Sequence, residues 1–498
     1  METKHCLLHL LNLWKWTCLL ITNQKEIICK DLRGEMFRRE AGDWAHQTFG
    51  ECNLGDERRT KRLVEVGKRL ANQIGCSLPK CCEGDKAALL GSYRLLRNDA
   101  VNPEAIRAGG FVATACQAQE HAVLLAVEDT TILTYEHAVA SQLGTTSNNP
   151  NAKRRGDQVH SVLLLDALSE QTVGLIEQSH WCREVESYGK KHQRKKRAYQ
   201  DKESYKWEQA SVQVEARLGA KMAHTISVCD READVYEYLS YKLRHSQRFV
   251  VRAKADRRLW ESQASLFETL KKQSTGACCY TVQVTQRGGR PARTAKLSLR
   301  GATLTLRPPS GSRAEIAPLC VKAVLAEEIE APANVEPLRW VLLTTEAVAS
   351  PEQALAVVRY YECRWRIEDY HKAWKSGVGV ERQRFQSPDN LARMIALTAF
   401  LAVRLLQLRE SQCQPAQPCD TVLNEDEWQV LWTSTEHDRR PTSPPTLGWA
   451  YLALAKLGGF TDTKRTGRPG WDTLWHGWFR LQERVKGYQI SQFSFTDL

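Results

Sequence analysis

Apolar residues between positions 36 and 105 recur at helical spacing. In the segment 54–75, an apolar face lies beside a face rich in lysine and arginine, which is typical of an amphipathic helix. The apolar face consists of Leu63, Val66, Leu70 and Ile74. Residues 36–105 are therefore expected to form a helical domain whose basic surface could bind DNA phosphates. An ordinary basic helical bundle explains the same pattern equally well.

Short apolar runs with polar ends follow, and they are typical of β-strands. The expected strands lie at 122–131, 159–168, 172–181, 225–229 and 248–254. The second and third of them are expected to pair through a polar turn, and the segment 203–221 has helical spacing. Strands that alternate with helices predict a mixed α/β domain.

A β-rich insertion is expected at about 258–345, because alternating residues there are separated by joints that contain glycine and proline. Helical spacing then returns at 360–377 and continues after a short gap. A polar, proline-rich connection leads to an amphipathic tail. The predicted organisation is an α/β domain at 106–410, which contains the insertion, followed by a helical C-terminal domain at 411–498.

The first 35 residues are expected to be an extension upstream of the folded protein. Their apolar run, 6–21, is too short to span a bilayer and is interrupted by polar residues. It lacks a convincing small-residue cleavage site of a signal peptide. Because globular patterning begins at a second methionine, Met36, we expect the fold to start there.

The chain of 498 residues is basic, with 70 lysine and arginine residues against 58 aspartate and glutamate residues and a net charge of +12. This balance favours a polyanionic partner such as DNA, although other classes of basic protein share it. The 16 cysteines include no C-x-x-C pair, so structural zinc is not expected. Scattered cysteines are typical of proteins in a reducing cytosol.

The segment 360–377 combines an apolar stripe with an unusual charged face. The stripe consists of Tyr360, Cys363, Ile367, Tyr370 and Trp374. At about 100° per residue, a second helical face gathers one carboxylate, three cations and a phenol. That face consists of Tyr361, Arg364, Glu368, Lys372 and Lys375. It would suit a helix that holds a metal ion against a phosphate backbone, and an ion-paired surface helix is the alternative.

Two aspartates stand where apolar strands are expected to end, namely Asp129 and Asp230. Together with Glu368 they give three carboxylates, which are the oxygen ligands that Mg²⁺ prefers and a sufficient set for two-metal phosphoryl transfer. Helix caps and turns account for most aspartates in such positions, so this spacing alone leaves a structural role open.

Each of these acids has a neighbouring competitor. Asp129 is preferred to Glu128, because adjacent residues of a strand face opposite ways. Glu368 is preferred to Asp369, because it shares a helical face with the cations. Asp230 competes with two acids that are expected on the following helix, Glu232 and Asp234.

Three motifs resemble those of a known family. They are "VEDTT" around Asp129, "VCDREAD" around Asp230, and Y-x-x-R-x-x-x-E-x-x-x-x-x-x-K from Tyr361 to Lys375. In these motifs the chain resembles the DDE cut-and-paste transposases of bacterial insertion sequences. It is most similar to the insertion-sequence-four family and, within that family, to the Tn-five type. The resemblance runs from about Met36 to the tail.

The resemblance implies an α/β fold with an RNase H-like mixed-sheet catalytic domain, interrupted by the β-rich insertion before the third acid. It implies that Asp129, Asp230 and Glu368 bind Mg²⁺, for which Mn²⁺ can substitute. The flanking helical domains would bind DNA ends at the N-terminal side and mediate dimerisation at the C-terminal side.

The resemblance also implies a set of DNA contacts. The tyrosine, arginine and lysine of the long motif would contact phosphates of the DNA end, and two tryptophans match positions associated with a flipped base. The residues expected to contact DNA are Tyr361, Arg364, Lys375, Lys372, Trp340, Trp365, Arg252, Arg59 and Arg62. For each tryptophan, a position in the core is the alternative.

The implied reaction is phosphoryl transfer on DNA through a hairpin intermediate, followed by joining of the freed 3′-OH to target DNA. A homodimer would hold two ends and cut them in trans, in the bacterial cytoplasm with the nucleoid and without a membrane partner. The first alternative is a metal-dependent nuclease of the same fold that performs no strand transfer. The second is an inactive DNA-binding inhibitor of transposition, which the intact acids and phosphate-binding motif disfavour.

Overall fold

The structure is a computed structural model, and it describes the chain from residue 41 onwards with several gaps. The described residues are 41–146, 154–182, 197–262, 264–273, 279–284, 293–309, 317–333, 335–410, 415–436, 438–463 and 469–492. The expected upstream extension at 1–35, and with it the expected start of the fold at Met36, lies outside these residues.

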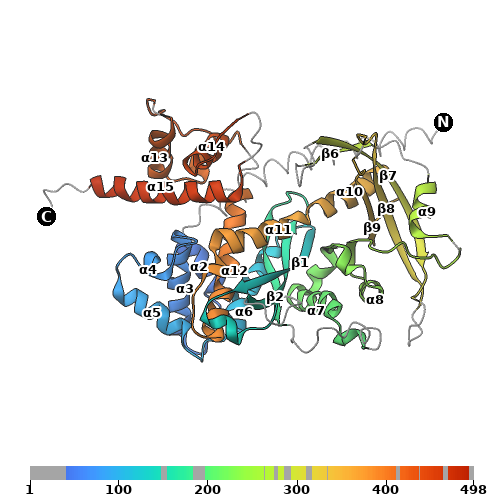
Figure 1. The fold of residues 1–498 in the computed structure, drawn as a ribbon, viewed down its shortest axis with the longest axis horizontal. Coiled ribbons are helices and arrows are strands. Elements are labelled where there is room, and N and C mark those ends of the chain that lie inside the picture. The colour runs from blue at the N-terminus through green and yellow to red at the C-terminus, as the bar shows by residue number, and fades with distance from the viewer. Residues whose placement is uncertain are drawn as a thin grey trace, which may run out of the picture. The chain divides into compact units, whose positions relative to one another are not determined.

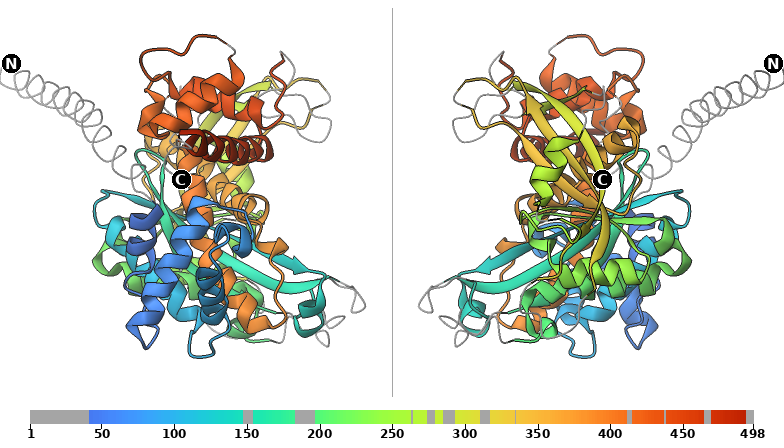
Figure 2. Two further views of the ribbon diagram at one scale, coloured as in Figure 1. Left: turned by 90° about the vertical axis from the view of Figure 1, so that its left-hand side faces the viewer. Right: turned by 90° about the vertical axis from the view of Figure 1, so that its right-hand side faces the viewer.

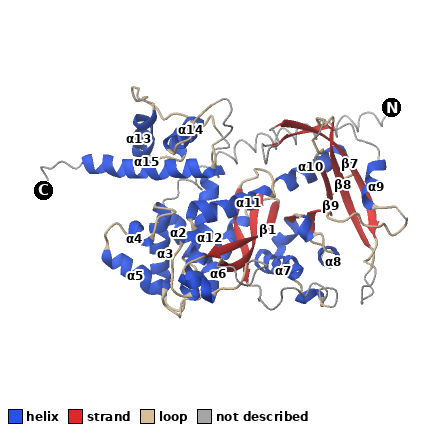
Figure 3. Cartoon of the chain, in the orientation of Figure 1, coloured by secondary structure: helices blue, strands red, loops and turns tan. Residues whose placement is uncertain are grey.

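A nine-stranded sheet of order β3-β2-β1-β4-β5-β9-β8-β7-β6 forms the framework of the larger part of the chain (Figures 1 and 3). Its strands are β1 (Leu124–Tyr135), β2 (Arg155–Asp166), β3 (Thr172–Trp181), β4 (Thr225–Cys229), β5 (Arg248–Arg252), β6 (Cys279–Val284), β7 (Arg293–Leu306), β8 (Leu319–Ile329) and β9 (Arg339–Thr344). The first three strands pair antiparallel, whereas β4 is parallel to β1 and β5 is parallel to β4. The mixed α/β sheet expected from the sequence is therefore confirmed.

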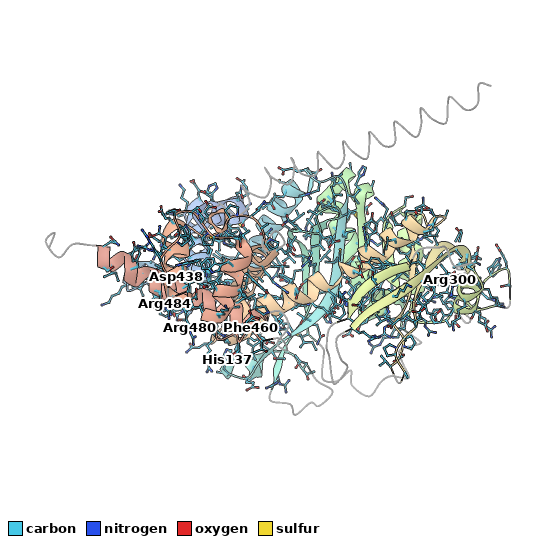
Figure 4. All side chains as sticks on the ribbon, turned by 90° about the horizontal axis from the view of Figure 1, so that it is seen from above. His137, Arg300, Asp438, Phe460, Arg480 and Arg484 are labelled. Carbon is cyan, nitrogen blue, oxygen red and sulfur yellow. The ribbon has the colours of Figure 1, made fainter. Side chains whose placement is uncertain are left out.

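The strands of the expected β-rich insertion continue this same sheet. Strand β9 pairs antiparallel with β5, and β8, β7 and β6 follow in order. The long strands β7 and β8 run side by side (Figure 2). Arg300 on β7, labelled in Figure 4, forms an ion pair with Glu327 on β8 at 3.2 Å. Hydrophobic alternation indicated β6, β7 and β9, but it indicated neither β8 nor the edge to which these strands are added.

Helices surround the sheet and make up both ends of the described chain. They are α2 (Ala41–Phe49), α3 (Glu57–Asn72), α4 (Leu78–Cys81), α5 (Lys86–Leu96), α6 (Pro103–Ala118), α7 (Lys206–Leu218), α8 (Tyr236–Arg244), α9 (Leu266–Lys272), α10 (Pro351–Glu362), α11 (Trp365–Lys372), α12 (Pro388–Glu410), α13 (Glu425–Thr435), α14 (Leu447–Leu457) and α15 (Trp471–Gln492). The larger of two units comprises residues 47–63 and 77–403, and the smaller one contains 64–76 and the chain from 404 onwards.

The two faces of β1 are covered by different helices. Leu124 and Ala126 belong to a buried cluster with Ala210 of α7. The residues between them point the other way, because side chains alternate along a strand. On that other face, the side-chain amide of Gln178 on β3 donates a hydrogen bond to the hydroxyl of Tyr370 on α11 at 3.1 Å, and α11 runs beside β1 (Figure 1). The alternation therefore assigns odd-numbered residues of β1 to the face of α11.

The smaller unit has a core of its own, in which α14 and α15 approach each other closely. A Cβ atom at Gly477 would lie only 1.8 Å from the carbonyl oxygen of Leu454, so glycine is required at this contact. Arg480, labelled in Figure 4, donates to the carbonyl oxygen of Leu457 at 2.8 Å. Both contacts fasten α15 to α14 within this helical unit.

Among the described residues, the helices are either too short or too polar to cross a lipid bilayer.

Trp374 follows α11 and is completely buried, and its indole N–H donates to the hydroxyl of Thr398 on α12 at 3.1 Å. We expect Trp374→Ala to lower the free energy of unfolding by about 3–5 kcal/mol, because it leaves a large cavity. Trp374→Phe should cost less, since it keeps most of the ring contacts and loses one hydrogen bond worth about 1 kcal/mol. Urea denaturation measures both changes. A Trp374→Ala variant as stable as the parent would show that the indole is not a core residue.

Candidate active site

Two parallel neighbours, β1 and β4, bring Asp129 and Asp230 to equivalent positions. Val127 of β1 is in register with Val228 of β4, and each aspartate follows its valine by two residues. Adjacent strands lie about 4.8 Å apart, so the two aspartates are close neighbours. Asp230 also begins a short turn, where its side chain accepts a hydrogen bond from the backbone N–H of Glu232 at 2.7 Å.

Asp129 lies in the middle of β1, not at its end as the sequence suggested. The strand continues to Tyr135, and its last residues pair with β2 alone, because β4 stops at Cys229. The aspartate therefore stands where the parallel ladder between β1 and β4 ends. The sequence pattern predicted that the strand of Asp129 ends at this residue. The strand that ends at this level of the sheet is its neighbour, β4.

The third acid, Glu368, is linked to Asp129 through the guanidinium of Arg364. The guanidinium of Arg364 donates to Oε1 of Glu368 at 2.6 Å and to Oδ2 of Asp129 at 3.3 Å. Arg364 is 6% exposed. One buried guanidinium thus joins an acid of α11 to an acid of β1, and Arg364 itself lies 235 positions from Asp129 in the sequence.

Burial dominates the electrostatics of this cluster. Burial raises the pKa of the Asp129 carboxyl, and the negative charges of Asp230 and Glu368 raise it further. The hydrogen bond from the N–H of Thr130 and the positive charge of Arg364 act in the opposite direction and lower it. Burial alone would lower the pKa of Arg364, but its hydrogen bond to Glu368 and the nearby acids raise it. Crowded carboxylates of this kind gain from any additional cation, because it relieves their mutual repulsion.

The competing acids are engaged elsewhere. Glu128 is buried on the opposite face of β1, where its carboxylate lies 3.4 Å from Nε2 of His160. Glu232 is exposed and pairs with Lys206 at 3.3 Å. Asp234 accepts hydrogen bonds from the guanidinium of Arg257, the shorter one at 2.6 Å. Glu232 and Asp234 lie in a turn before α8, not on the helix as expected, because α8 begins only at Tyr236.

The chemistry of these donors fits a divalent metal ion. As the side chains stand, the described residues include no group of three or more histidine, cysteine, aspartate or glutamate side chains placed to hold a metal. The cation between Asp129 and Glu368 in this structure is Arg364. Three neighbouring carboxylates, two of which already bond a cation, are suitable ligands for Mg²⁺ or Mn²⁺.

The segment 360–377 is not one continuous helix. Helix α10 ends at Glu362, α11 starts at Trp365, and a π-helical turn follows at Ala373–Val378. The apolar stripe is confirmed at four of its five positions: Ile367, Tyr370 and Trp374 are completely buried and Cys363 is buried, whereas Tyr360 is half-buried. Because the helix is interrupted between Glu362 and Trp365, the residues of the expected charged face do not all lie on one side of a single helix.

Two residues of that face lie inside the protein. Tyr361 is 4% exposed, and Arg364 is held between the acids. The turn between α10 and α11 directs Arg364 towards β1, whereas Lys372 remains exposed. Local π-helical turns within helices are frequent at functional sites.

Lys375 lies in the π-helical turn and points to β1. Its ammonium donates to the carbonyl oxygen of Ile132 at 2.6 Å and lies 3.8 Å from Oε1 of Glu381. Glu381 in turn accepts hydrogen bonds from the backbone N–H and the hydroxyl of Thr134, at 2.9 and 3.1 Å. The sequence pattern did not indicate Glu381 or Thr134. Periodicity reports which residues share a face of one helix or strand, and it gives no signal for a contact between a turn and a distant strand.

The two tryptophans differ in accessibility. The ring of Trp340 on β9 contacts that of Tyr361 edge to face, with centroids 5.7 Å apart. Trp365 is 49% exposed, and the guanidinium of Arg364 lies over its ring at 5.0 Å. Trp365 is therefore the large aromatic surface that is open to a ligand beside the acids.

The remaining expected DNA contacts lie on other elements. Arg252 is at the end of β5, and its guanidinium donates to the carbonyl oxygen of Arg339 at 3.4 Å. Arg59 and Arg62 are on α3, where Arg59 donates to the carbonyl oxygen of Leu54 at 2.9 Å and Arg62 is exposed. They belong to the basic helical region and not to the cluster of acids.

Two protein families match the chain. The transposase DNA-binding family matches residues 41–101, and the transposase DDE domain matches residues 213–404. The second match contains Asp230 and Glu368 and begins after Asp129. It also identifies the mixed sheet as RNase H-like. With a DNA-binding region and a DDE domain on one polypeptide, the chain is a DDE transposase, an enzyme that performs metal-dependent phosphoryl transfer on DNA.

Proposed function

We propose that this transposase binds inverted-repeat ends of a mobile element, cleaves them through a hairpin intermediate and joins them to target DNA. The observation that carries the proposal is that Arg364, a buried cation, bonds both Asp129 and Glu368, while Asp230 lies close enough to Asp129 to raise the pKa of its carboxyl. The long motif from Tyr361 to Lys375 supports membership of the insertion-sequence-four family and its Tn-five type.

Asp129, Asp230 and Glu368 would hold the metal. A bound divalent ion, Mg²⁺ in our proposal, activates the attacking oxygen and stabilises the charge that develops on the leaving oxygen. The acids contribute position as well as charge, because Asp129 lies on β1 and Asp230 directly follows the adjacent strand β4. Arg364 already bonds two acids, so it lies where a phosphate beside the metal would be held.

The reaction consists of successive displacements at phosphorus. Water first attacks a phosphodiester at the end of the element and releases a 3′-OH. That hydroxyl attacks the opposite strand, forms a hairpin and releases the flanking DNA. A second water opens the hairpin, and the freed 3′-OH attacks a phosphodiester of target DNA. Every step exchanges one P–O bond for another, so no covalent link to the protein is needed.

A homodimer would hold two ends in one complex and cut each end in trans. The helical C-terminal region is the proposed dimerisation region, and the basic α3 would contact the ends through Arg59 and Arg62. A strand-transfer product formed from pre-cleaved ends and a plasmid target separates this function from that of a simple nuclease.

Removing any one of the three acids should abolish cleavage and leave end binding largely intact, because the carboxylates hold metal and not DNA. The variants are Asp129→Ala, Asp230→Ala and Glu368→Ala. The measurement is nicking of a labelled end duplex with Mg²⁺, together with a gel-shift assay. Glu232→Gln is the matched control, since this exposed acid lies beside Asp230 and pairs with Lys206. Normal nicking by an acid variant would remove that residue from the active site.

Neutralising Arg364 or Lys372 should weaken binding of the end duplex and reduce its salt dependence. Each lost phosphate contact should change the slope of log K against log salt by about 0.9, because fewer counterions are released. Fluorescence anisotropy over a salt series measures this slope for Arg364→Gln and Lys372→Gln. Slopes equal to that of the parent would return both residues to the role of ion-paired surface or core charges.

Trp365→Ala should slow hairpin formation more than the first nick. Closing a hairpin is easier when one base leaves the stack, and an exposed indole recovers about 1–3 kcal/mol by stacking on that base. At about 1.4 kcal/mol per tenfold in rate, hairpin formation should fall about 5- to 140-fold. A time course that resolves nicked, hairpin and broken products provides the measurement.

Trp365→Phe is the control for this experiment, because it keeps an aromatic ring at the same position. Trp340→Ala is expected to act in the same direction. The ring of Trp340 also packs on Tyr361, so its loss should affect the first nick as well. If both steps fall equally in Trp365→Ala, then stacking on a base is not the function of Trp365.

A further inference from the structure

Lys375 is held by two groups of its own chain in a way that leaves part of its ammonium free. The Nζ atom donates to the carbonyl oxygen of Ile132 at 2.6 Å, and it faces Oε1 of Glu381 at 3.8 Å. The side chain is 29% exposed. An ammonium has three donors, so one N–H can still point to a phosphate at the surface.

Glu381 is itself fixed to the catalytic strand. Both of its hydrogen bonds come from Thr134, one from the backbone N–H and one from the hydroxyl. Thr134 lies on β1, the strand that carries Asp129, and β1 pairs with β2 over its whole length. The carboxylate is therefore held on a rigid element at a defined distance from the acids.

The chain reverses after the π-helical turn so that Glu381 returns to Lys375. Gly379 makes this reversal with φ of 73°, a conformation that side chains other than glycine rarely adopt. A Cβ atom at Gly379 would also lie 2.4 Å from Nε of Arg382. Glu381 follows in a short turn at Val380–Arg382. The local backbone is thus shaped to place this carboxylate beside the lysine.

The contact matters because Lys375 is half-buried and flexible. Burial lowers the pKa of the Lys375 ammonium, and Glu381 opposes this shift. A lysine side chain has about 2 kcal/mol of rotamer entropy to lose when it is fixed. A lysine that is already held loses less of this freedom when DNA binds.

We propose that Glu381 is a positioning residue of the transposase, which fixes the Lys375 ammonium against β1 for contact with a phosphate of the DNA end. The inference rests on the proposed transposase function and on the phosphate contact that the family resemblance implies for Lys375. It extends that role, because it names Glu381, a residue outside the long sequence motif, as the group that orients Lys375.

A purely electrostatic role and a positioning role of Glu381 predict opposite effects of Glu381→Gln on DNA binding. A carboxylate near DNA repels phosphates, so its removal should strengthen binding if it acts only through its charge. If it positions Lys375, its removal should weaken binding although the protein becomes more positive. The glutamine keeps an oxygen that can accept the hydrogen bonds of Thr134, so the fold should be preserved.

The experiment is a double-mutant cycle in end-duplex binding over a salt series. The proteins are the parent, Glu381→Gln, Lys375→Gln and the double variant. We expect Glu381→Gln to weaken binding about tenfold, in line with loss of one charged hydrogen bond, and to reduce the salt slope by about 0.9. The double variant should bind no more weakly than Lys375→Gln alone.

Two further variants control for charge and for folding. Glu352→Gln removes an exposed carboxylate at the start of α10 and should not weaken end binding. Thr134→Val keeps the shape of the side chain but removes one donor to Glu381, so it should weaken binding by less than Glu381→Gln. This variant also tests the proposal if Glu381→Gln does not fold.

Tighter binding by Glu381→Gln, or additive losses in the double variant, would overturn the inference and leave the function of Lys375 intact. If Lys375→Gln leaves the affinity and the salt slope unchanged, the phosphate contact is contradicted and the inference falls with it. Cleavage that still depends on Asp129, Asp230 and Glu368 would show that the proposed chemistry survives either outcome.

Discussion

The parallel pairing of β1 with β4 is the constraint on which the active site depends. It places Asp129 on β1 and Asp230, the first residue after β4, at equivalent positions, so that backbone pairing of the two strands brings the aspartates together. Helix α11 then brings Glu368 to the same face, where Arg364 bonds Asp129 and Glu368. An ion or a phosphate that binds there meets groups already held in place, which reduces the reorganisation needed for reaction.

The same strand organises the positive charges. Arg364 bonds Asp129 on β1, whereas Lys375 bonds the carbonyl oxygen of Ile132 further along that strand. Both cations are partly buried, and both have a carboxylate partner, Glu368 or Glu381. Burial makes unpaired charges costly, so each cation is stabilised by its acid partner. In our proposal the site combines acids that bind metal with cations that bind phosphate.

Much of this arrangement follows from local sequence patterns, and the rest depends on contacts between distant segments. The strands, the mixed α/β class and the buried stripe of Ile367, Tyr370 and Trp374 follow from periodicity, which reports burial. The break before Trp365 and the long course of β1 beyond Asp129 do not, since they depend on neighbouring elements. The partnership of Glu381 with β1 had no local signal, because it joins residues 247 positions apart.

The most direct test of the central claim is to locate the metal in a complex of the protein with an uncleaved end duplex. Crystals grown with Mn²⁺ would give anomalous scattering that identifies each bound ion. The account predicts Mn²⁺ ligated by Asp129, Asp230 and Glu368 beside a phosphate of the end. Ions bound reproducibly at other carboxylates, with these three acids unligated, would contradict it.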